Sequence, residues 1–222
     1  MNTAIIVAAG SGTRFQSETP KQYLDLAGIP VLMHSIRAFE NCDEIDEIIL
    51  AVNTDFDEKL LASRLTLKPI KHIIGGNSRL ESVIKALEAV SSDTQIVVIH
   101  DGVRPMVTPN EIKATIKAAR TVGAACLTAP VTDTIKRVDG ETIVSTVDRM
   151  ELRRALTPQA FNLRLLLSAI DARDEEVEFT DESSIVEDYG KHVAAVEGSA
   201  ANIKITHPQD LLIAEVLLRA RN

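Results

Sequence analysis

The chain has 222 residues, of which 45% are hydrophobic and 25% charged, and a formal net charge of −8. That length fits one α/β domain with a sizeable core. The acidic balance argues against a general surface for nucleic acid or for anionic membranes. The two cysteines have no metal-ligand spacing, no stretch approaches the ~20 apolar residues of a membrane span, and the N-terminus carries no signal-like segment. We therefore expect a cytoplasmic enzyme or binding protein.

Short apolar runs alternate along the chain with amphipathic stretches. The runs are predicted strands: Ala4–Ala8, Glu47–Val52, Ile70–Ile74, Ile96–His100, Ala125–Pro130 and Val193–Val196. The stretches are predicted helices: Val31–Glu40, Asp57–Leu65, Ser78–Val90, Asn110–Val122, Asn162–Ala172 and Pro208–Arg221. This alternation indicates a mostly parallel sheet covered by helices on both faces. Ligands bind beyond the carboxyl ends of the strands in such sheets, which would gather the loops 9–21, 75–82 and 100–105.

One segment, Thr134–Thr146, departs from this alternation. Asp139-Gly140 lies between two β-prone runs, which predicts a hairpin. A two-stranded ribbon is marginal in water, so it needs a further surface, either its own domain or a second subunit. The pattern favours neither of these over the other.

The first loop lies within "AAGSGTRFQSETPKQ", residues 8–22. Phe15 stands where a dinucleotide fingerprint has its third glycine, and no Gly-Lys-Ser/Thr follows, so neither familiar phosphate loop is present. Gly10 and Gly12 allow backbone amides to approach a polyphosphate, while Arg14 and Lys21 supply positive charge for its oxygens. An ordinary turn with solvated cations is the alternative, but the position behind a buried strand favours phosphate binding.

The second loop, residues 75–82, leads into a predicted helix. Its glycines and exposed amides can contact the edge of a base. Ser78, with Glu81 three residues later, can also form a helix capping box. The two functions are compatible.

The third loop, residues 100–105, places a carboxylate and a guanidinium at the end of a strand. Asp101 can accept a hydrogen bond from a hydroxyl and Arg104 can bind a phosphate, or the two can form a salt bridge. His100 lies beside an apolar run and is expected to be a hydrogen-bonded core residue. The sequence contains no visible Ser/His/Asp triad and no His/Cys cluster with ligand spacing, so we assign no metal ligand.

Taken in order, these segments resemble one family. The motifs are "AAGSGTRF…PKQ", "GGNSRLESV", "HDGVRP", "PVTDTIKR", "VDR…LTPQAF", "TDESS" and "NIKIT". They are similar to the 2-C-methyl-D-erythritol 4-phosphate cytidylyltransferases of non-mevalonate isoprenoid biosynthesis. The first motif marks only the wider nucleotidyltransferase superfamily, whereas the ordered set, from Ile5 to Leu217, is specific.

The resemblance implies a single Rossmann-like nucleotidyltransferase domain over residues 1–222, with residues 132–150 as a protruding β-hairpin arm for dimerisation. It implies transfer of CMP from CTP to 2-C-methyl-D-erythritol 4-phosphate, releasing pyrophosphate and forming 4-diphosphocytidyl-2-C-methyl-D-erythritol. Mg²⁺ would bridge the CTP phosphates. The arm would embrace a second subunit and complete the substrate site of that subunit.

The resemblance also implies roles for individual residues. The residues that steady the triphosphate and the transition state would be Arg14, Lys21 and Lys204. The CTP-binding residues would be Ala8, Ala9, Gly10, Gly12, Gly76, Asn77 and Ser82. The residues that bind methylerythritol phosphate would be Asp101, Arg104, Thr134, Arg149 and Thr157. The family often has an aromatic residue at Arg153, and some members have an acidic residue at Asn77.

Two other interpretations remain open at this point. A ribitol 5-phosphate cytidylyltransferase shares the first loop and the "HD…RP" segment. The second interpretation is a non-catalytic nucleotide-binding domain. Simple binding would need fewer positive charges near the α-phosphate than the three supplied by Arg14, Lys21 and Lys204.

Overall fold

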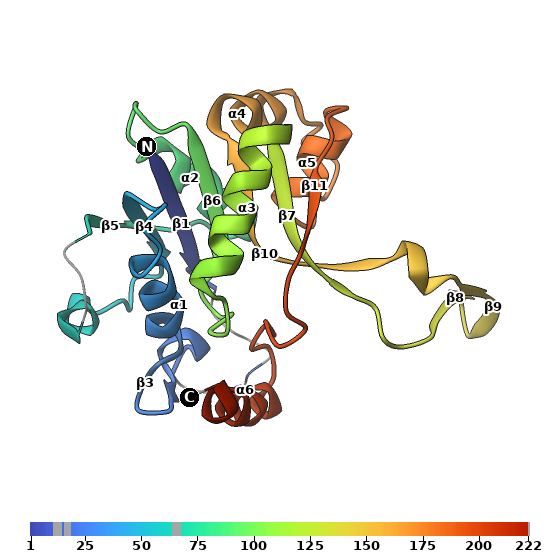
Figure 1. The fold of residues 1–222 in the computed structure, drawn as a ribbon, viewed down its shortest axis with the longest axis horizontal. Helices are drawn as coiled ribbons and strands as arrows, with labels where there is room; N and C mark the ends of the chain where they lie inside the picture. The colour runs from blue at the N-terminus through green and yellow to red at the C-terminus, as the bar shows by residue number, and fades with distance from the viewer. Residues whose placement is uncertain (11–14, 16–18, 64–67, 222) are drawn as a thin grey trace.

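The computed structural model describes residues 1–10, 15, 19–63 and 68–221 (Figure 1). Its centre is a seven-stranded sheet in the order β11-β7-β10-β6-β1-β4-β5. The strands are β1 (Asn2–Ala8), β4 (Glu47–Val52), β5 (Ile70–Ile74), β6 (Ile96–Asp101), β7 (Ala124–Pro130), β10 (Arg153–Asn162) and β11 (Ala194–Glu197). All six strands expected from the sequence are present, with ends that differ by at most one or two residues.

The sheet is mostly parallel, as predicted. β1 pairs in parallel with β4 and β6, β4 pairs in parallel with β5, and β11 pairs in parallel with β7. The unpredicted strand β10 lies between β6 and β7 and is antiparallel to both. The carboxyl ends of β1, β5 and β6 therefore meet at one edge, where the three loops begin.

Helices cover both faces of the sheet. Figure 1 shows α1 (Val31–Glu40) and α3 (Pro109–Val122) in front of it, and their apolar residues share a core with Ile6 of β1. The other face carries α2 (Arg79–Glu88), α4 (Leu163–Ala172) and α5 (Glu182–Asp188), which share a second core with Ile5. Successive residues of β1 thus point into opposite cores, as the strand repeat requires.

The remaining elements are short or peripheral. They are the 3₁₀ helices η2 (Lys21–Tyr23), η3 (Glu58–Ser63) and η4 (Arg149–Glu151), the strands β2 (Asp25–Leu26) and β3 (Ile29–Pro30), and helix α6 (Pro208–Arg221). The helix predicted over Asp57–Leu65 is wrong in type where the chain is described, because residues 58–63 form 3₁₀ structure. Among the described residues, no helix combines the length and apolar character needed to cross a membrane.

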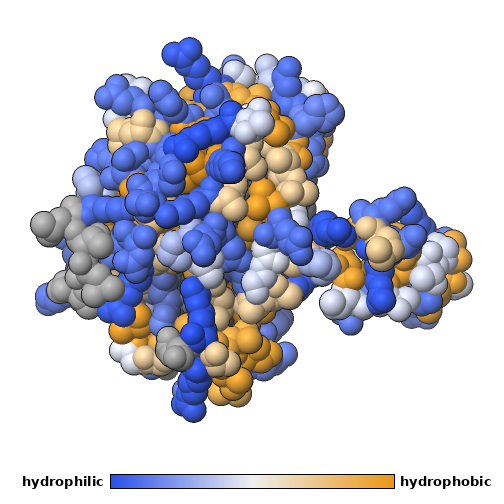
Figure 2. All heavy atoms as spheres, in the orientation of Figure 1, coloured by the Kyte–Doolittle hydropathy of each residue, from blue (hydrophilic) through white to orange (hydrophobic). Residues whose placement is uncertain are grey.

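The predicted hairpin is present as β8 (Ile135–Asp139) and β9 (Thr142–Val147), which form a two-stranded antiparallel sheet of their own. Gly140 makes the turn with φ of +54°, a conformation that glycine adopts without strain. Val138, Ile143 and Val144 are 60–62% exposed. Figures 1 and 2 show the hairpin apart from the sheet and its helices, with apolar atoms on its surface.

Candidate active site

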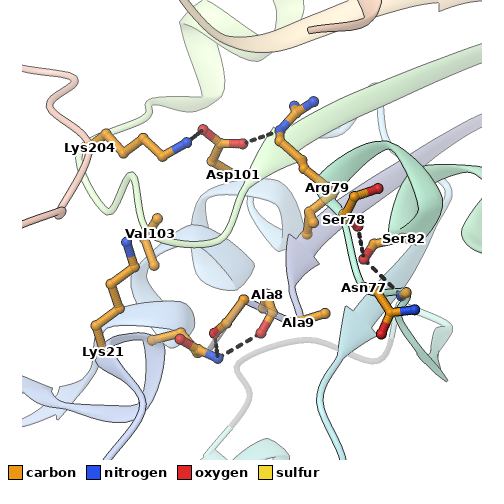
Figure 3. Close-up of a pocket in the computed structure, with 14 residues that line it drawn as sticks. Ala8, Ala9, Lys21, Asn77, Ser78, Arg79, Ser82, Asp101, Val103 and Lys204 are labelled. Atoms are coloured by element: carbon orange, nitrogen blue, oxygen red, sulfur yellow. Dashed lines mark hydrogen bonds and ion pairs between the residues drawn. The ribbon is translucent and has the colours of Figure 1, made fainter. Parts of the chain in front are cut away.

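Two adjoining cavities open at the carboxyl ends of the parallel strands. The first encloses about 510 Å³ and is lined by the ends of β1 and β6, the loop after β5, the start of α2, and η2 (Figure 3). The second encloses about 210 Å³ and borders β10. Arg79, Asp101 and Lys204 line both cavities. Two molecules bound in these cavities would meet at this shared wall.

The first cavity gathers most of the residues expected to contact CTP and its phosphates. These are Ala8, Ala9, Gly10, Lys21, Gly76, Asn77, Ser82 and Lys204. Gly12 and Arg14 lie outside the described residues, so their assignments stay predictions. Among the residues expected to bind the acceptor, Asp101 also lines this cavity.

The second loop is held in shape by its own side chains. The Ser82 hydroxyl accepts a hydrogen bond from the Gly76 amide at 2.9 Å and donates to the Ser78 carbonyl at 2.8 Å. Its hydrogen is therefore engaged within the loop, and one lone pair is left for a ligand. Ser82 can meet a nucleotide only as an acceptor while this arrangement holds.

The predicted capping box is half correct. Ser78 is the N-cap of α2, and its hydroxyl accepts from the Glu81 amide at 3.0 Å. The Glu81 carboxylate, however, accepts from the amide of Asn77 at 2.8 Å, one residue beyond the amide that a capping box uses. This hydrogen bond fixes the main chain at Asn77, which lines the first cavity.

Gly75 is required by the close approach of two loops. A Cβ at this position would lie 2.4 Å from the Cβ of Ala9 and 2.8 Å from the hydroxyl oxygen of Ser82. Any side chain there would push apart the segments that follow β1 and β5. Glycine at this position therefore lets the segment after β5 pack against Ala9 and Ser82, which line the first cavity.

Gln22 is a site-building residue that the sequence analysis missed. Its side chain is buried, and its amide nitrogen donates to the carbonyls of Ala8 at 2.8 Å and Gly10 at 3.1 Å. The two bonds hold the start of the first loop against η2. The motif "PKQ" contained this residue, but only its lysine suggested chemistry.

Asp101 is buried among three cations. Its carboxylate lies 2.9 Å from Arg79 Nε, 2.9 Å from Lys204 Nζ and 3.3 Å from Arg104 Nε. The Asp101–Arg104 salt bridge, which the sequence left as an alternative to ligand binding, is therefore present, and Asp101 still borders both cavities. Burial alone would raise the pKa of Asp101, but the charges of Arg79, Lys204 and Arg104 together hold it well below its ordinary value.

Arg79 and Glu182 are the other functional candidates that sequence reasoning missed. Glu182, at the first turn of α5, is buried, and both of its oxygens accept from Nη1 of Arg79. Burial would lower the pKa of Arg79, but Glu182 and Asp101 raise it above its ordinary value. Arg79 stays charged and joins α2, α5 and the end of β6 at the shared wall.

The second cavity gathers part of the predicted acceptor site. Asp101, Arg104 and Thr157 line it together with Lys204. Thr134 and Arg149 line neither cavity within one protomer. Arg149, at the base of the hairpin, is exposed and donates to the main-chain carbonyl of Thr132.

Comparison with known proteins agrees with this geometry. The family model of 2-C-methyl-D-erythritol 4-phosphate cytidylyltransferase matches residues 2–220. The cytidylyltransferase of that name from Desulforamulus reducens is 43% identical over 99% of this chain and 96% of its own length. The one from Halalkalibacterium halodurans is 42% identical over 97% of this chain and 96% of its own length. The chain also spans 58% of a bifunctional IspD/IspF enzyme from Desulfotalea psychrophila, at 43% identity.

Solved structures give the same result. The 4-diphosphocytidyl-2C-methyl-D-erythritol synthase of Anaerococcus prevotii superposes with a TM-score of 0.87 at 30% identity, covering 98% of this chain and 96% of that one. The 2-C-methyl-D-erythritol 4-phosphate cytidylyltransferase of Thermus thermophilus has a TM-score of 0.79 at 33% identity, with 97% and 98% covered. The chain therefore belongs to the 2-C-methyl-D-erythritol 4-phosphate cytidylyltransferase family.

Proposed function

We propose that the first cavity holds CTP and the second holds the acceptor phosphate, so that CMP transfer takes place at their shared wall. As a member of its family, the chain is a cytidylyltransferase that transfers CMP from CTP to 2-C-methyl-D-erythritol 4-phosphate and releases pyrophosphate. The observation that carries the placement is that Arg79, Asp101 and Lys204 border both cavities. Direct transfer requires the two substrates to be held in contact, which adjoining cavities provide.

The cations of the first cavity suit its triphosphate end. In the view of Figure 3, Lys21 and Lys204 lie on one side of the pocket and Asn77 and Ser82 on the other. This separation supports phosphates beside the lysines and the nucleoside beside the second loop. The Lys204 side chain is 37% exposed although its Nζ contacts Asp101. Its ammonium group can therefore contact a bound phosphate as well as Asp101. Arg14 would add a third cation to this end.

The proposed chemistry needs positioning and charge stabilisation more than proton transfer. A phosphate oxygen of the acceptor attacks the α-phosphorus of CTP, and the bond to the β-phosphate breaks as pyrophosphate leaves on the far side. That oxygen is already anionic near neutral pH, so no general base is required. Lys21, Lys204 and Arg14 would stabilise the charge that develops on the phosphates.

Mg²⁺ is proposed to enter the site bound to the phosphates of CTP. Within residues 1–10, 15, 19–63 and 68–221, no three His, Cys, Asp or Glu side chains lie close enough together to hold a metal ion. Asp101, the nearest candidate, has both oxygens paired with cations. We therefore propose no protein ligand for the ion among the described side chains. The ion would take its ligands from the triphosphate and water.

We further propose that the hairpin region, residues 132–150, completes the second cavity of a partner subunit. Support comes from the exposed apolar residues of the hairpin, which need another surface. It comes also from Thr134 and Arg149, which the resemblance assigns to the acceptor but which lie outside both cavities of their own protomer. A homodimer would bring them to the acceptor. The cytoplasmic setting expected from the sequence stays a prediction.

A pyrophosphate-release assay tests the proposed function. The purified protein is given CTP, ATP, GTP or UTP with methylerythritol phosphate, and CTP with ribitol 5-phosphate. We expect the highest kcat/KM for CTP with methylerythritol phosphate. A higher kcat/KM for ribitol 5-phosphate would contradict the acceptor, and equal rates with all four nucleotides would contradict the assignment of the first cavity.

A further inference from the structure

The side chain of His100 is buried behind the acceptor cavity rather than within it. It is fully inaccessible to solvent, and its ring lies 5.1 Å from the ring of Phe39. Its Nε2 lies 3.3 Å from the main-chain oxygen of Arg104, and its Nδ1 lies 2.9 Å from the hydroxyl oxygen of Thr157. Because it does not line either cavity, it acts only through these neighbours.

These partners determine where the imidazole carries its hydrogen. The carbonyl of Arg104 can only accept, so Nε2 must be protonated to bond with it. Burial, assisted by the neighbouring guanidinium of Arg104 and opposed by Asp101, lowers the pKa of His100 to about 3. The ring is therefore neutral, and its Nδ1 is left as an acceptor. The hydroxyl of Thr157 must donate to it.

The bonds of the Thr157 hydroxyl leave that group no hydrogen for a ligand. Its hydroxyl oxygen accepts from the main-chain amide of Asp101 at 3.1 Å. Its carbonyl accepts from the side-chain amide of Asn202 at 2.9 Å, which fixes the backbone at this point. One lone pair of the hydroxyl oxygen remains. At the second cavity, which Thr157 lines, its hydroxyl can therefore act only as a hydrogen-bond acceptor.

We propose that His100 is a positioning residue, which fixes the Thr157 hydroxyl as an acceptor so that the second cavity recognises a hydroxyl hydrogen of the polyol phosphate. The inference rests on the proposed placement of the acceptor in that cavity. Asp101 adds a carboxylate, which also only accepts, while Arg104 and Lys204 supply donors for anionic oxygens. The cavity thereby separates the two ends of its ligand: hydroxyl groups donate to Thr157 and Asp101, and the phosphate accepts from the cations.

The hydrogen-bond direction can be tested in the unmodified protein. Long-range ¹⁵N NMR of the histidine rings distinguishes a protonated Nε2 from a protonated Nδ1. We expect His100 as the neutral Nε2–H form at pH 7. An Nδ1–H form, or a doubly protonated ring, would overturn the inference whatever reaction the enzyme performs.

The consequence for the acceptor is tested with substrate analogues. Each hydroxyl of methylerythritol phosphate is replaced in turn by hydrogen or by fluorine, which accepts weakly and cannot donate. Thr157→Val identifies the substrate hydroxyl that faces Thr157. Removal of that hydroxyl lowers kcat/KM in the wild type but leaves kcat/KM of this variant unchanged. At that position, we expect kcat/KM in the wild type to fall about tenfold and to fall as far with fluorine as with hydrogen, with the KM for CTP unchanged.

His100→Leu removes the nitrogen that receives the Thr157 hydrogen. The threonine can then donate, so we expect the fluorinated analogue to become a better substrate than the deoxy analogue. A merely structural role would lower kcat/KM for all acceptors by the same factor, and that result would overturn the inference. So would a wild type that prefers fluorine to hydrogen at this position. No turnover of the natural acceptor by the wild type would instead refute the proposed function, while the NMR result would still decide the hydrogen-bond direction.

Discussion

Arg79 and Glu182, 103 positions apart in the sequence, form an ion pair between a partly buried guanidinium and a buried carboxylate. One guanidinium nitrogen donates to both carboxylate oxygens, at 2.6 and 2.8 Å. The Nε of the same arginine donates to Asp101 at 2.9 Å. One guanidinium thus ties the second loop to α5 and to the end of β6. The pair holds in place the carboxylate that both substrates are proposed to meet.

Glu182→Gln tests this connection. The substitution leaves the partly buried guanidinium with a neutral partner in place of one of its two carboxylates, so we expect the free energy of unfolding to fall by about 2 kcal/mol. Urea denaturation measures the loss. Glu187→Gln, at an exposed position of the same helix, is the matched control and should change the stability by no more than about 0.5 kcal/mol. A loss as small in Glu182→Gln would mean that the pair contributes nothing to the fold.

Asp101 should give the stability a dependence on acid pH. Its pKa in the folded protein is held below its ordinary value because the charges of Arg79, Lys204 and Arg104 outweigh the effect of burial. The stabilisation is therefore complete above the unfolded pKa of about 4 and is lost as the pH falls below it. A single group of this kind changes the unfolding free energy by at most about 1.4 kcal/mol per pH unit.

The measurement compares urea unfolding of the wild type and Asp101→Asn between pH 7 and pH 3. We expect the variant to be less stable at pH 7 and the difference to shrink as the pH falls below about 4. Asp171→Asn, at an exposed position of α4, serves as the control. A difference that stays constant down to pH 3 would show that the three cations do not stabilise the ionised form.

The fold was largely predictable, and the exceptions have physical causes. Apolar runs such as Glu47–Val52 identify strands because parallel strands are buried on both faces. Strand β10 was not predicted because its sequence contains Pro158, and a proline normally argues against a central strand. The structure accommodates Pro158 where the pairing with β7 is irregular, between Ala155 and Gln159. Such an irregularity depends on tertiary structure and leaves no periodic signal.

The lining of the candidate site was predictable where a loop follows a strand, as for Gly10, Gly76 and Asp101, which line the first cavity. The site was not predictable where a charged side chain is buried because it pairs with an opposite charge far away in the sequence. A glutamate such as Glu182 is almost never fully buried unless it is paired. Helix α5 has only 7 residues, which is too short for a recognisable hydrophobic periodicity. Gln22 was missed because the acceptors of its hydrogen bonds are main-chain carbonyls, which any sequence provides.

Lys21→Ala should separate catalysis from nucleotide binding. If Lys21 stabilises charge that develops in the transition state, kcat should fall about 100-fold while the Kd for CTP changes by much less. Pre-steady-state pyrophosphate release and calorimetric CTP binding give the two quantities. Lys117→Ala, at an exposed position of α3 away from both cavities, is the control. A large rise in Kd with kcat retained would instead assign Lys21 to docking of the nucleotide.

Arg149→Ala should act across subunits if the hairpin region completes a neighbouring site. Each active site would then combine Lys21 of one protomer with Arg149 of the other. We expect Arg149→Ala and Lys21→Ala homodimers to be nearly inactive. Heterodimers that carry one variant in each protomer should recover activity, because one of their two sites is intact. Differently tagged protomers, co-purified by both tags, provide the heterodimer, and doubly substituted protomers mixed with Lys21→Ala are the control. Inactive heterodimers of verified composition, or a monomeric enzyme with full activity, would contradict the shared site.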